Sequence, residues 1–344
     1  MTRREALGRV LAAAPAALSG CARRGRGRTT LRVSSVPYLT MSPLYLARDL
    51  GHFSDLGLDV EIIQNAEISQ RLPLLLGGEL DAAFLALFPA IPAAVLKGAL
   101  LRLVAGRDRT SSECATTGAI YGRKDSFPDG FSDLSCLRGK RIAIGPRTGI
   151  SEFFVDMLLE SAGLRYDNVE LVPLRQADAV AALVAGRVDA LLGTRAERDY
   201  QTLAVDVIKG PSFNDVFPGF QFAFIAFGPT LLEADREKGV TFLVGYLRGV
   251  KSFLEGETPD YFEELARRSG RDPEVARAAC RASFAKHGRL DLRSIDLFTR
   301  WAVRKGYCPK FVPARKFVDF SYIDEAWQRF ERLYGGWESP HSGT

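Results

Sequence analysis

The sequence has few features of catalytic or metal-binding proteins. It holds three histidines in 344 residues, and none is spaced for metal binding. The motifs His-Glu-x-x-His, Gly-x-Ser-x-Gly and Cys-x-x-Cys are all absent, which removes common signatures of zinc hydrolases, serine hydrolases and thioredoxin-like enzymes. We therefore expect no catalytic residues, no metal and no cofactor, in a protein that is not an enzyme.

Long hydrophobic runs and a basic folded region are also missing. No stretch approaches the roughly 18 apolar residues of a membrane-spanning helix. The net charge is +5, but residues 1–30 hold seven arginines and one glutamate, so the chain from Leu31 onward carries −1. A nearly neutral domain lacks the basic surface with which proteins bind nucleic acid, so nucleic acid is not an expected partner.

The N-terminus has the pattern of an export signal. Residues 1–21 combine basic residues, a short Ala-rich stretch and small residues at the end. The last four residues, LSGC, match the lipobox of bacterial lipoproteins, in which Cys21 would carry the lipid; an ordinary signal with a chance cysteine is the alternative. The Sec and twin-arginine routes both stay open. Residues 22–30 predict a flexible tether. We expect an exported domain, lipid-anchored to a bacterial membrane and facing the periplasm or the exterior.

Four further cysteines follow the lipobox, an even number for an exported chain. They allow three disulfide connectivities. Proximity in sequence favours Cys114–Cys136 and Cys280–Cys308, and free buried thiols are the alternative.

Two distant stretches share one pattern. LGGELDAAF (76–84) and VAGRVDALL (184–192) align Gly78 with Gly186 and Asp81 with Asp189. Extended outward, residues 31–87 and 140–193 both predict strand, helix, strand, helix, strand. We expect the glycines to end helices and the aspartates to open strands, as structural residues rather than ligand contacts.

Strands that alternate with helices predict parallel sheets in two α/β units. We expect residues 101–106 to add a strand to the first unit and residues 117–123 and 220–228 to cross between the units. After Pro229 the pattern is helical, and we expect those helices to pack on the first unit. The resulting divisions are 1–21 signal peptide, 22–30 tether, 31–116 plus 227–344 domain I, and 117–226 domain II.

Four segments carry a resemblance to a known family: SPLYLARDLGHFSDLGLDVEI, LLLGGELDAAFLALFPAIPAAVLKG, LRGKRIAIGPRTG and DAVAALVAGRVDALLG. In this order they resemble the periplasmic substrate-binding proteins of ABC importers, in the group for aliphatic sulfonates, nitrate and thiamine precursors. The resemblance runs from Leu31 to about Trp337, although CLRGK and the Phe-rich FNDVFPGFQFAFIAF depart from the family pattern. It implies a type II periplasmic-binding-protein-like fold: two α/β domains, each a mostly parallel sheet flanked by helices, with a cleft between. The implied partners are a small-molecule solute, an ABC permease, and the lipid bilayer through Cys21.

In open α/β sheets, ligands sit outside the carboxyl ends of the strands. The turn GPRTGIS (145–151) offers backbone N–H groups at a helix start, and Arg147 can bind a sulfonate or carboxylate with two hydrogen bonds. N-capping by its hydroxyl residues and a solvated Arg147 are the alternatives. The expected ligand contacts are Ser35, Tyr38, Thr40, Gln64, Asn65, Leu85, Arg147, Thr148, Ser151, Gln176, Thr194 and Gln221.

The apolar strand end at Leu85, Leu87 and Phe88, together with a Tyr38 ring, favours an organic anion or a flat aromatic or amphiphilic solute over a bare inorganic ion. Two other functions stay open. One is the binding component of a non-ABC lipid or sterol carrier or of a sensor system. The other is a binding-protein-like enzyme of cofactor biosynthesis, which export to a membrane surface disfavours.

Overall fold

The first α/β unit follows the expected order. A computed structural model describes residues 29–36, 39–64, 68–111, 118–145, 147–193, 200–256, 263, 267, 284, 287–335 and 337. The unit contains β1 (Thr29–Ser35), η1 (Leu39–Met41), α1 (Ser42–Asp49), η2 (Ser54–Leu56), β2 (Leu58–Gln64), α2 (Ile68–Leu76), β3 (Ala82–Ala86), α3 (Ala90–Leu96) and β4 (Arg102–Gly106). β1 pairs in parallel with both β2 and β3, which confirms the predicted parallel arrangement.

The second unit repeats this order. It contains β5 (Ala119–Arg123), η3 (Leu134–Leu137), β6 (Arg141–Ile144), α4 (Ile150–Ser161), η4 (Tyr166–Asn168), β7 (Glu170–Pro173), α5 (Gln176–Val184), β8 (Ala190–Gly193), β9 (Val207–Ser212) and α7 (Phe213–Val216). β6 pairs in parallel with β7 and β8. The chain then continues through β10 (Ala223–Phe227), η5 (Thr230–Ala234), α8 (Arg236–Glu255), α11 (Leu292–Arg304), η6 (Ala314–Lys316) and α12 (Phe320–Tyr334).

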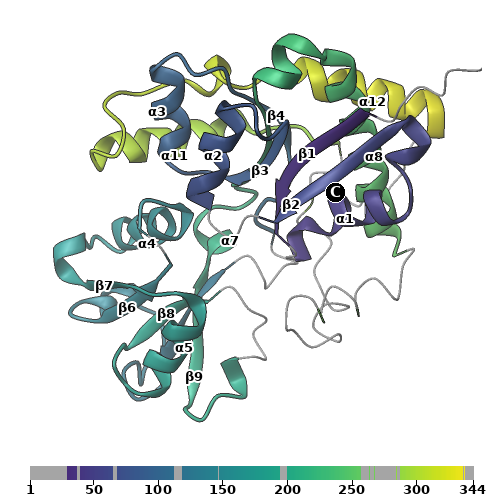
Figure 1. The fold of residues 1–344 in the computed structure, drawn as a ribbon. Helices are drawn as coiled ribbons and strands as arrows, with labels where there is room; N and C mark the ends of the chain where they lie inside the picture. The colour runs from purple at the N-terminus through teal and green to yellow at the C-terminus, as the bar shows by residue number, and fades with distance from the viewer. Residues whose placement is uncertain are drawn as a thin grey trace, which may run out of the picture.

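The two sheets lie in separate units, with β1 to β4 in one and β6 to β9 in the other (Figure 1), and they have the same internal arrangement. Their strand orders are β2-β1-β3-β10-β4 and β7-β6-β8-β5-β9. In each sheet the fourth strand, β10 or β5, runs antiparallel to both of its neighbours. The predicted fold class, two mostly parallel sheets flanked by helices, is therefore confirmed. Strand β10 belongs to the first sheet, although the expected division placed most of it in domain II.

The matched glycines and aspartates occupy matching positions. Gly78 and Gly186 follow α2 and α5 with φ of 75° and 68°, a left-handed conformation that favours glycine at a helix end. Asp81 and Asp189 each stand directly before a strand, β3 or β8. Their carboxylates bond within their own unit, so the structural role expected for these residues is confirmed.

The crossing segments join the carboxyl edges of the two sheets. The first leaves the carboxyl end of β4 and enters β5 at Ala119, which pairs with Gly193 at the carboxyl end of β8. The return segment enters β10 at Ala223, which pairs with Ala86 at the carboxyl end of β3. Thr110 ties the two crossings together, because its hydroxyl donates to Phe217 O at 2.6 Å and accepts from Phe220 N at 2.8 Å.

The C-terminal helices divide between the two units. Helices α8 and α12 pack on the first unit, as expected, through α1 and β4. Gly249 lets α8 approach α1, since a Cβ there would lie 2.0 Å from Pro43 O. Helix α11 differs from the expectation, because it contacts α4 of the second unit: Trp301 Nε1 donates to Asp156 at 2.8 Å, and the Trp301 ring packs edge-on against Phe153.

Two expectations about covalent and membrane features can be compared with the described residues. Cys136 and Cys308 are free thiols, so neither of the two pairs favoured by proximity is formed. Their expected partners, Cys114 and Cys280, lie outside the described residues, as does Cys21. Among the described helices, none is long and apolar enough to cross a membrane.

Candidate functional site

The predicted contacts of the first unit gather at the carboxyl edge of its sheet. Ser35 and Gln64 end the paired strands β1 and β2 and stand opposite each other. Ser35 is buried, whereas Gln64 and Thr40 are exposed. Leu85 is only 1% exposed and lies in the hydrophobic core, so its side chain stabilises the sheet in this conformation. Tyr38 and Asn65 lie outside the described residues.

The GPRTGIS turn of the second unit already binds an anion, the carboxylate of Glu152. This buried side chain accepts hydrogen bonds from Thr148 N at 2.6 Å, from Arg147 Nε at 3.4 Å and from the Tyr307 hydroxyl at 2.9 Å. A carboxylate in the first turn of α4 is favoured by the helix dipole. An external sulfonate at Thr148 and Arg147 would therefore meet a negative charge that the chain itself supplies.

The two alternatives considered for this turn have different outcomes. The N-cap of α4 is Gly149, with no side-chain cap bond, so neither Thr148 nor Ser151 caps the helix. The Arg147 side chain is 52% exposed, which resembles a solvated arginine with one weak ion pair. Thr148 has φ of 67°, a strained conformation for a β-branched residue. The ligand roles of these three residues stay predictions.

Two of the three predicted glutamine contacts, Gln176 and Gln221, are bound to protein groups. Gln176 begins α5 and donates to the hydroxyl of Tyr200 at 3.2 Å. Gln221 is buried in the returning crossing segment, where its amide donates to Arg289 O at 3.1 Å and accepts Asp291 N–H at 2.6 Å. Gln221 thereby fixes the start of α11. Thr194 lies outside the described residues.

Sequence reasoning missed an ion pair at the same edge. Arg107 and Asp108 follow β4 directly, with Nη2 2.8 Å from Oδ2 and side chains 1% and 2% exposed. The strand-end rule applies to residues 102–106 as much as to the other strands, so the signal was present in the sequence. Burial raises the pKa of Asp108, and the adjacent Arg107 charge opposes that shift.

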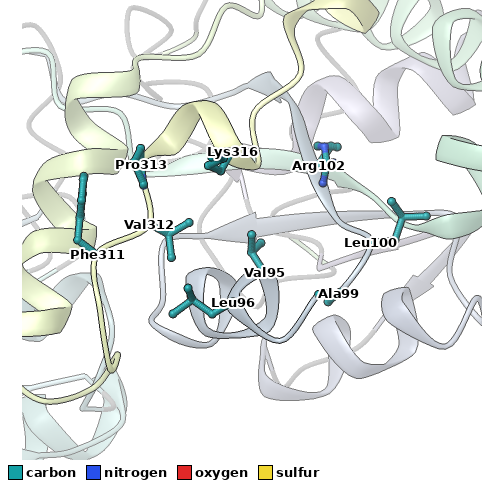
Figure 2. A pocket seen from close by; sticks show the side chains of 10 residues that line it. Val95, Leu96, Ala99, Leu100, Arg102, Phe311, Val312, Pro313 and Lys316 are labelled. Carbon is teal, nitrogen blue, oxygen red and sulfur yellow. The ribbon is translucent and has the colours of Figure 1, made fainter.

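Pockets elsewhere contain none of the predicted contacts. One of about 480 Å³ lies at the amino end of β4, where Figure 2 shows side chains from α3 and from the segment before η6. A smaller one of about 270 Å³ includes His287 and Trp327, whose rings stack at 4.2 Å. Within the described part of the chain, no cluster of His, Cys, Asp or Glu has an arrangement that could hold a metal ion. The 480 Å³ pocket is lined by Val95, Leu96, Gly98, Ala99, Leu100, Arg102, Phe311, Val312, Pro313 and Lys316.

Two α/β units joined at their carboxyl edges define the class of periplasmic-binding-protein folds. The NMT1/THI5-like family matches residues 39–255, and the chain belongs to that family. No curated protein is similar to it in sequence.

Solved structures share the fold at low sequence identity. A putative periplasmic sulfonate-binding protein SsuA of a sulfonate ABC transporter from Methylobacillus flagellatus is 18% identical, with a TM-score of 0.71 over 91% of this chain and 98% of that one. The periplasmic nitrate-binding protein NrtA from Synechocystis is 13% identical, with a TM-score of 0.70 over 88% and 89%. A DszB mutant in complex with biphenyl-2-sulfinic acid is 14% identical, with a TM-score of 0.62 over 88% and 99%.

Proposed function

We propose that this protein is a solute-binding protein that captures a small organic molecule between its two units and delivers it to an ABC-type importer. The joining of the carboxyl edges of both sheets by the crossing segments carries the proposal, because ligands of open α/β sheets bind outside those edges. Closure of two domains around a ligand is a common mechanism of capture. Similarity to the sulfonate- and nitrate-binding proteins supports the same role.

We infer a ligand site formed by the predicted contacts at these edges, with Ser35, Thr40 and Gln64 on the first unit and Ser151 and Gln176 on the second. Leu85 and Leu87 are in the core, so the partly buried Phe88 is the apolar residue left at this strand end. Together with the polar groups of both units it suits an organic anion or a flat aromatic or amphiphilic molecule. The protein binds this solute without converting it, and it needs no cofactor.

The experiment begins with the chain from Thr29 onward, purified from an exporting host. Native mass spectrometry detects a bound solute, and denaturation releases it for identification. Once identified, the solute is prepared with a label. It is expected to bind at one molecule per chain and to be recovered unchanged. Deleting the gene in its own bacterium is expected to abolish uptake of that solute. Chemical conversion of the solute would make the protein an enzyme, and unchanged uptake would exclude the importer role.

The proposed anchor is a lipid on Cys21, which holds the domain at a bacterial membrane facing the periplasm or the exterior. The lipobox LSGC and the tether predicted for residues 22–30 support it, although the structure corrects the end of that tether, because Thr29 and Thr30 already belong to β1. The full-length chain is expected in the membrane fraction with an acylated N-terminal peptide, and Cys21→Ser is expected to remove the acyl group. An unmodified cysteine in the mature wild-type protein would contradict the proposal.

An enzyme is the second candidate, and one observation favours it. DszB, an enzyme, shares this fold, so the architecture is compatible with catalysis. The recovery of unchanged solute in the experiment above separates the two candidates.

A further inference from the structure

The Arg107–Asp108 pair is buried at the edge of the first sheet outside which ligands of open α/β sheets bind. Both residues follow β4 at the carboxyl edge of the first sheet and begin the crossing to the second unit. The backbone N–H of Arg107 donates to Ala223 O at 2.9 Å, and Asp108 O accepts Phe222 N–H at 3.4 Å. The pair is therefore fixed between the two crossing segments.

The Arg107 guanidinium is enclosed by aromatic side chains, among them Tyr246, whose hydroxyl interacts with it. It lies over the ring of Phe84 at 5.0 Å, and that ring packs edge-on against Tyr246. One polar contact comes from the loop after β1, where Thr40 O accepts Nη2 at 3.4 Å. Thr40 is itself one of the predicted ligand contacts, so the guanidinium reaches the candidate site from inside the domain.

Three polar atoms of this pair have no hydrogen-bond partner among the described residues. They are Nε and Nη1 of Arg107 and Oδ1 of Asp108, all buried. The hydroxyl of Ser42, two residues beyond Thr40, is also buried and unpartnered. Buried polar groups in native proteins are nearly always satisfied by protein, water or ligand. Two donors and one acceptor on one ion pair therefore point to a group that bonds to both residues.

We propose that Arg107 and Asp108 bind an uncharged amide-type group of the solute. A carbonyl oxygen of that group accepts from Arg107, and its adjacent N–H donates to Asp108 Oδ1. This inference rests on the proposed function, because it assigns the chemistry of the solute at that site.

Charge balance favours a neutral group over an ion. The positive charge of Arg107 is already matched by Asp108 at 2.8 Å, and both side chains are buried. A sulfonate or carboxylate would add an unpaired negative charge beside a buried carboxylate, and a cation would meet Arg107 in the same way. An amide supplies an acceptor and a donor without net charge. The solute therefore differs in this group from the sulfonate and nitrate named for the relatives.

The test uses a matched pair of probes, trifluoroacetamide and trifluoroacetate, which differ little in size but differ in charge. ¹⁹F NMR titration of the chain from Thr29 onward measures both affinities. The wild-type protein is expected to bind the amide at least tenfold more tightly than the acid. Asp108→Asn keeps the shape of the side chain and removes its charge, so the preference is expected to fall at least tenfold. The exposed variant Asp129→Asn is expected to leave the preference unchanged.

Two results of these measurements would overturn the inference. One is equal or tighter binding of trifluoroacetate by the wild-type protein. The other is a crystal structure, soaked with trifluoroacetamide, in which water alone occupies the positions beside Arg107 Nε and Asp108 Oδ1. Failure of the proposed function is distinguishable, because a protein that binds the amide at this pair but serves no importer would keep the inference. A solute that is delivered to the importer but places no amide-type group at the pair would overturn this inference and keep the proposed function.

Discussion

The carboxylate of Asp189 accepts the backbone N–H of Arg141 at 2.8 Å and also binds the guanidinium of that arginine at 3.1 Å. Asp81 makes the corresponding backbone bond with Arg32 at 2.7 Å. In each unit the arginine also donates to the carbonyl of the helix-ending glycine, at 3.0 and 2.7 Å. The repeated Gly and Asp therefore tie the start of one parallel strand to its neighbour.

This contact predicts a pH-dependent contribution of Asp189 to stability. Burial alone would raise the pKa of Asp189, but the bonds from Arg141 lower it below its ordinary value of 3.8. When folding lowers the pKa of a carboxyl group, the ionised group stabilises the folded protein at pH values above its unfolded-state pKa. That stabilisation is lost as the pH falls through the folded-state pKa. Asp189→Asn is expected to cost about 1.5 kcal/mol at pH 7, and the difference is expected to shrink below pH 3.8.

Urea unfolding of both proteins between pH 3 and 7 measures that difference, in steps of roughly one pH unit. The exposed variant Asp129→Asn is a control that should change stability by less than about 0.5 kcal/mol. If Asp189→Asn lowered the free energy of unfolding equally at every pH, the charge of Asp189 would not be what Arg141 binds.

The order of elements in both units could be predicted because it depends on local patterns. Runs of β-branched residues predict the strands, and helical periodicity predicts the helices between them. Gly186 marks a helix end by its own backbone preference. Helix α11 shows the limit of such patterns. Its periodicity predicts a buried face but does not say which helix covers that face, so contact with α4 was not foreseen.

The candidate site shows the same limit at the level of single residues. The strand-end rule places Ser35 and Gln64 at the correct edge, but it does not report that Leu85 is in the core or that Gln221 is bonded to the start of α11. Those outcomes depend on residues more than 60 positions away. The burial of Arg107 likewise requires Phe84 and Tyr246 to meet over it, which no local pattern encodes.

The contact between α11 and α4 predicts the effect of Trp301→Phe. The ring would still fill most of the space, but the bond to Asp156 would be lost, leaving Oδ2 of a buried carboxylate without its indole donor. Lys305 would still bind the other oxygen at 2.8 Å. The expected cost is about 2 kcal/mol in the free energy of unfolding, measured by urea denaturation. A cost below about 0.5 kcal/mol would mean that the indole bond contributes nothing.

The strained backbone at Thr148 predicts that Thr148→Gly stabilises the protein. A left-handed conformation costs a residue with a Cβ about 1–2 kcal/mol, whereas glycine adopts it without strain. Greater freedom of glycine in the unfolded chain offsets part of that gain. The net stabilisation is expected to be about 0.5–1 kcal/mol, while Thr148→Ser, which keeps the strain, should gain nothing. Thermal unfolding compares the three proteins, and destabilisation by glycine would indicate that the threonine side chain supports the turn.

The two described cysteines predict the thiol chemistry of the folded chain. Burial raises the pKa of Cys136, and the nearby Asp133 charge raises it further, so less reactive thiolate forms at neutral pH. Iodoacetamide at pH 8 is expected to modify Cys136 several times more slowly than a cysteine in a short peptide. Cys308 is 1% exposed and is expected to stay unmodified until denaturant unfolds the protein. Peptide mass spectrometry of protein exported under oxidising conditions measures modification at both cysteines. Peptides that link Cys136 to Cys114, or Cys308 to Cys280, would show that the disulfide pairing favoured by proximity forms after all.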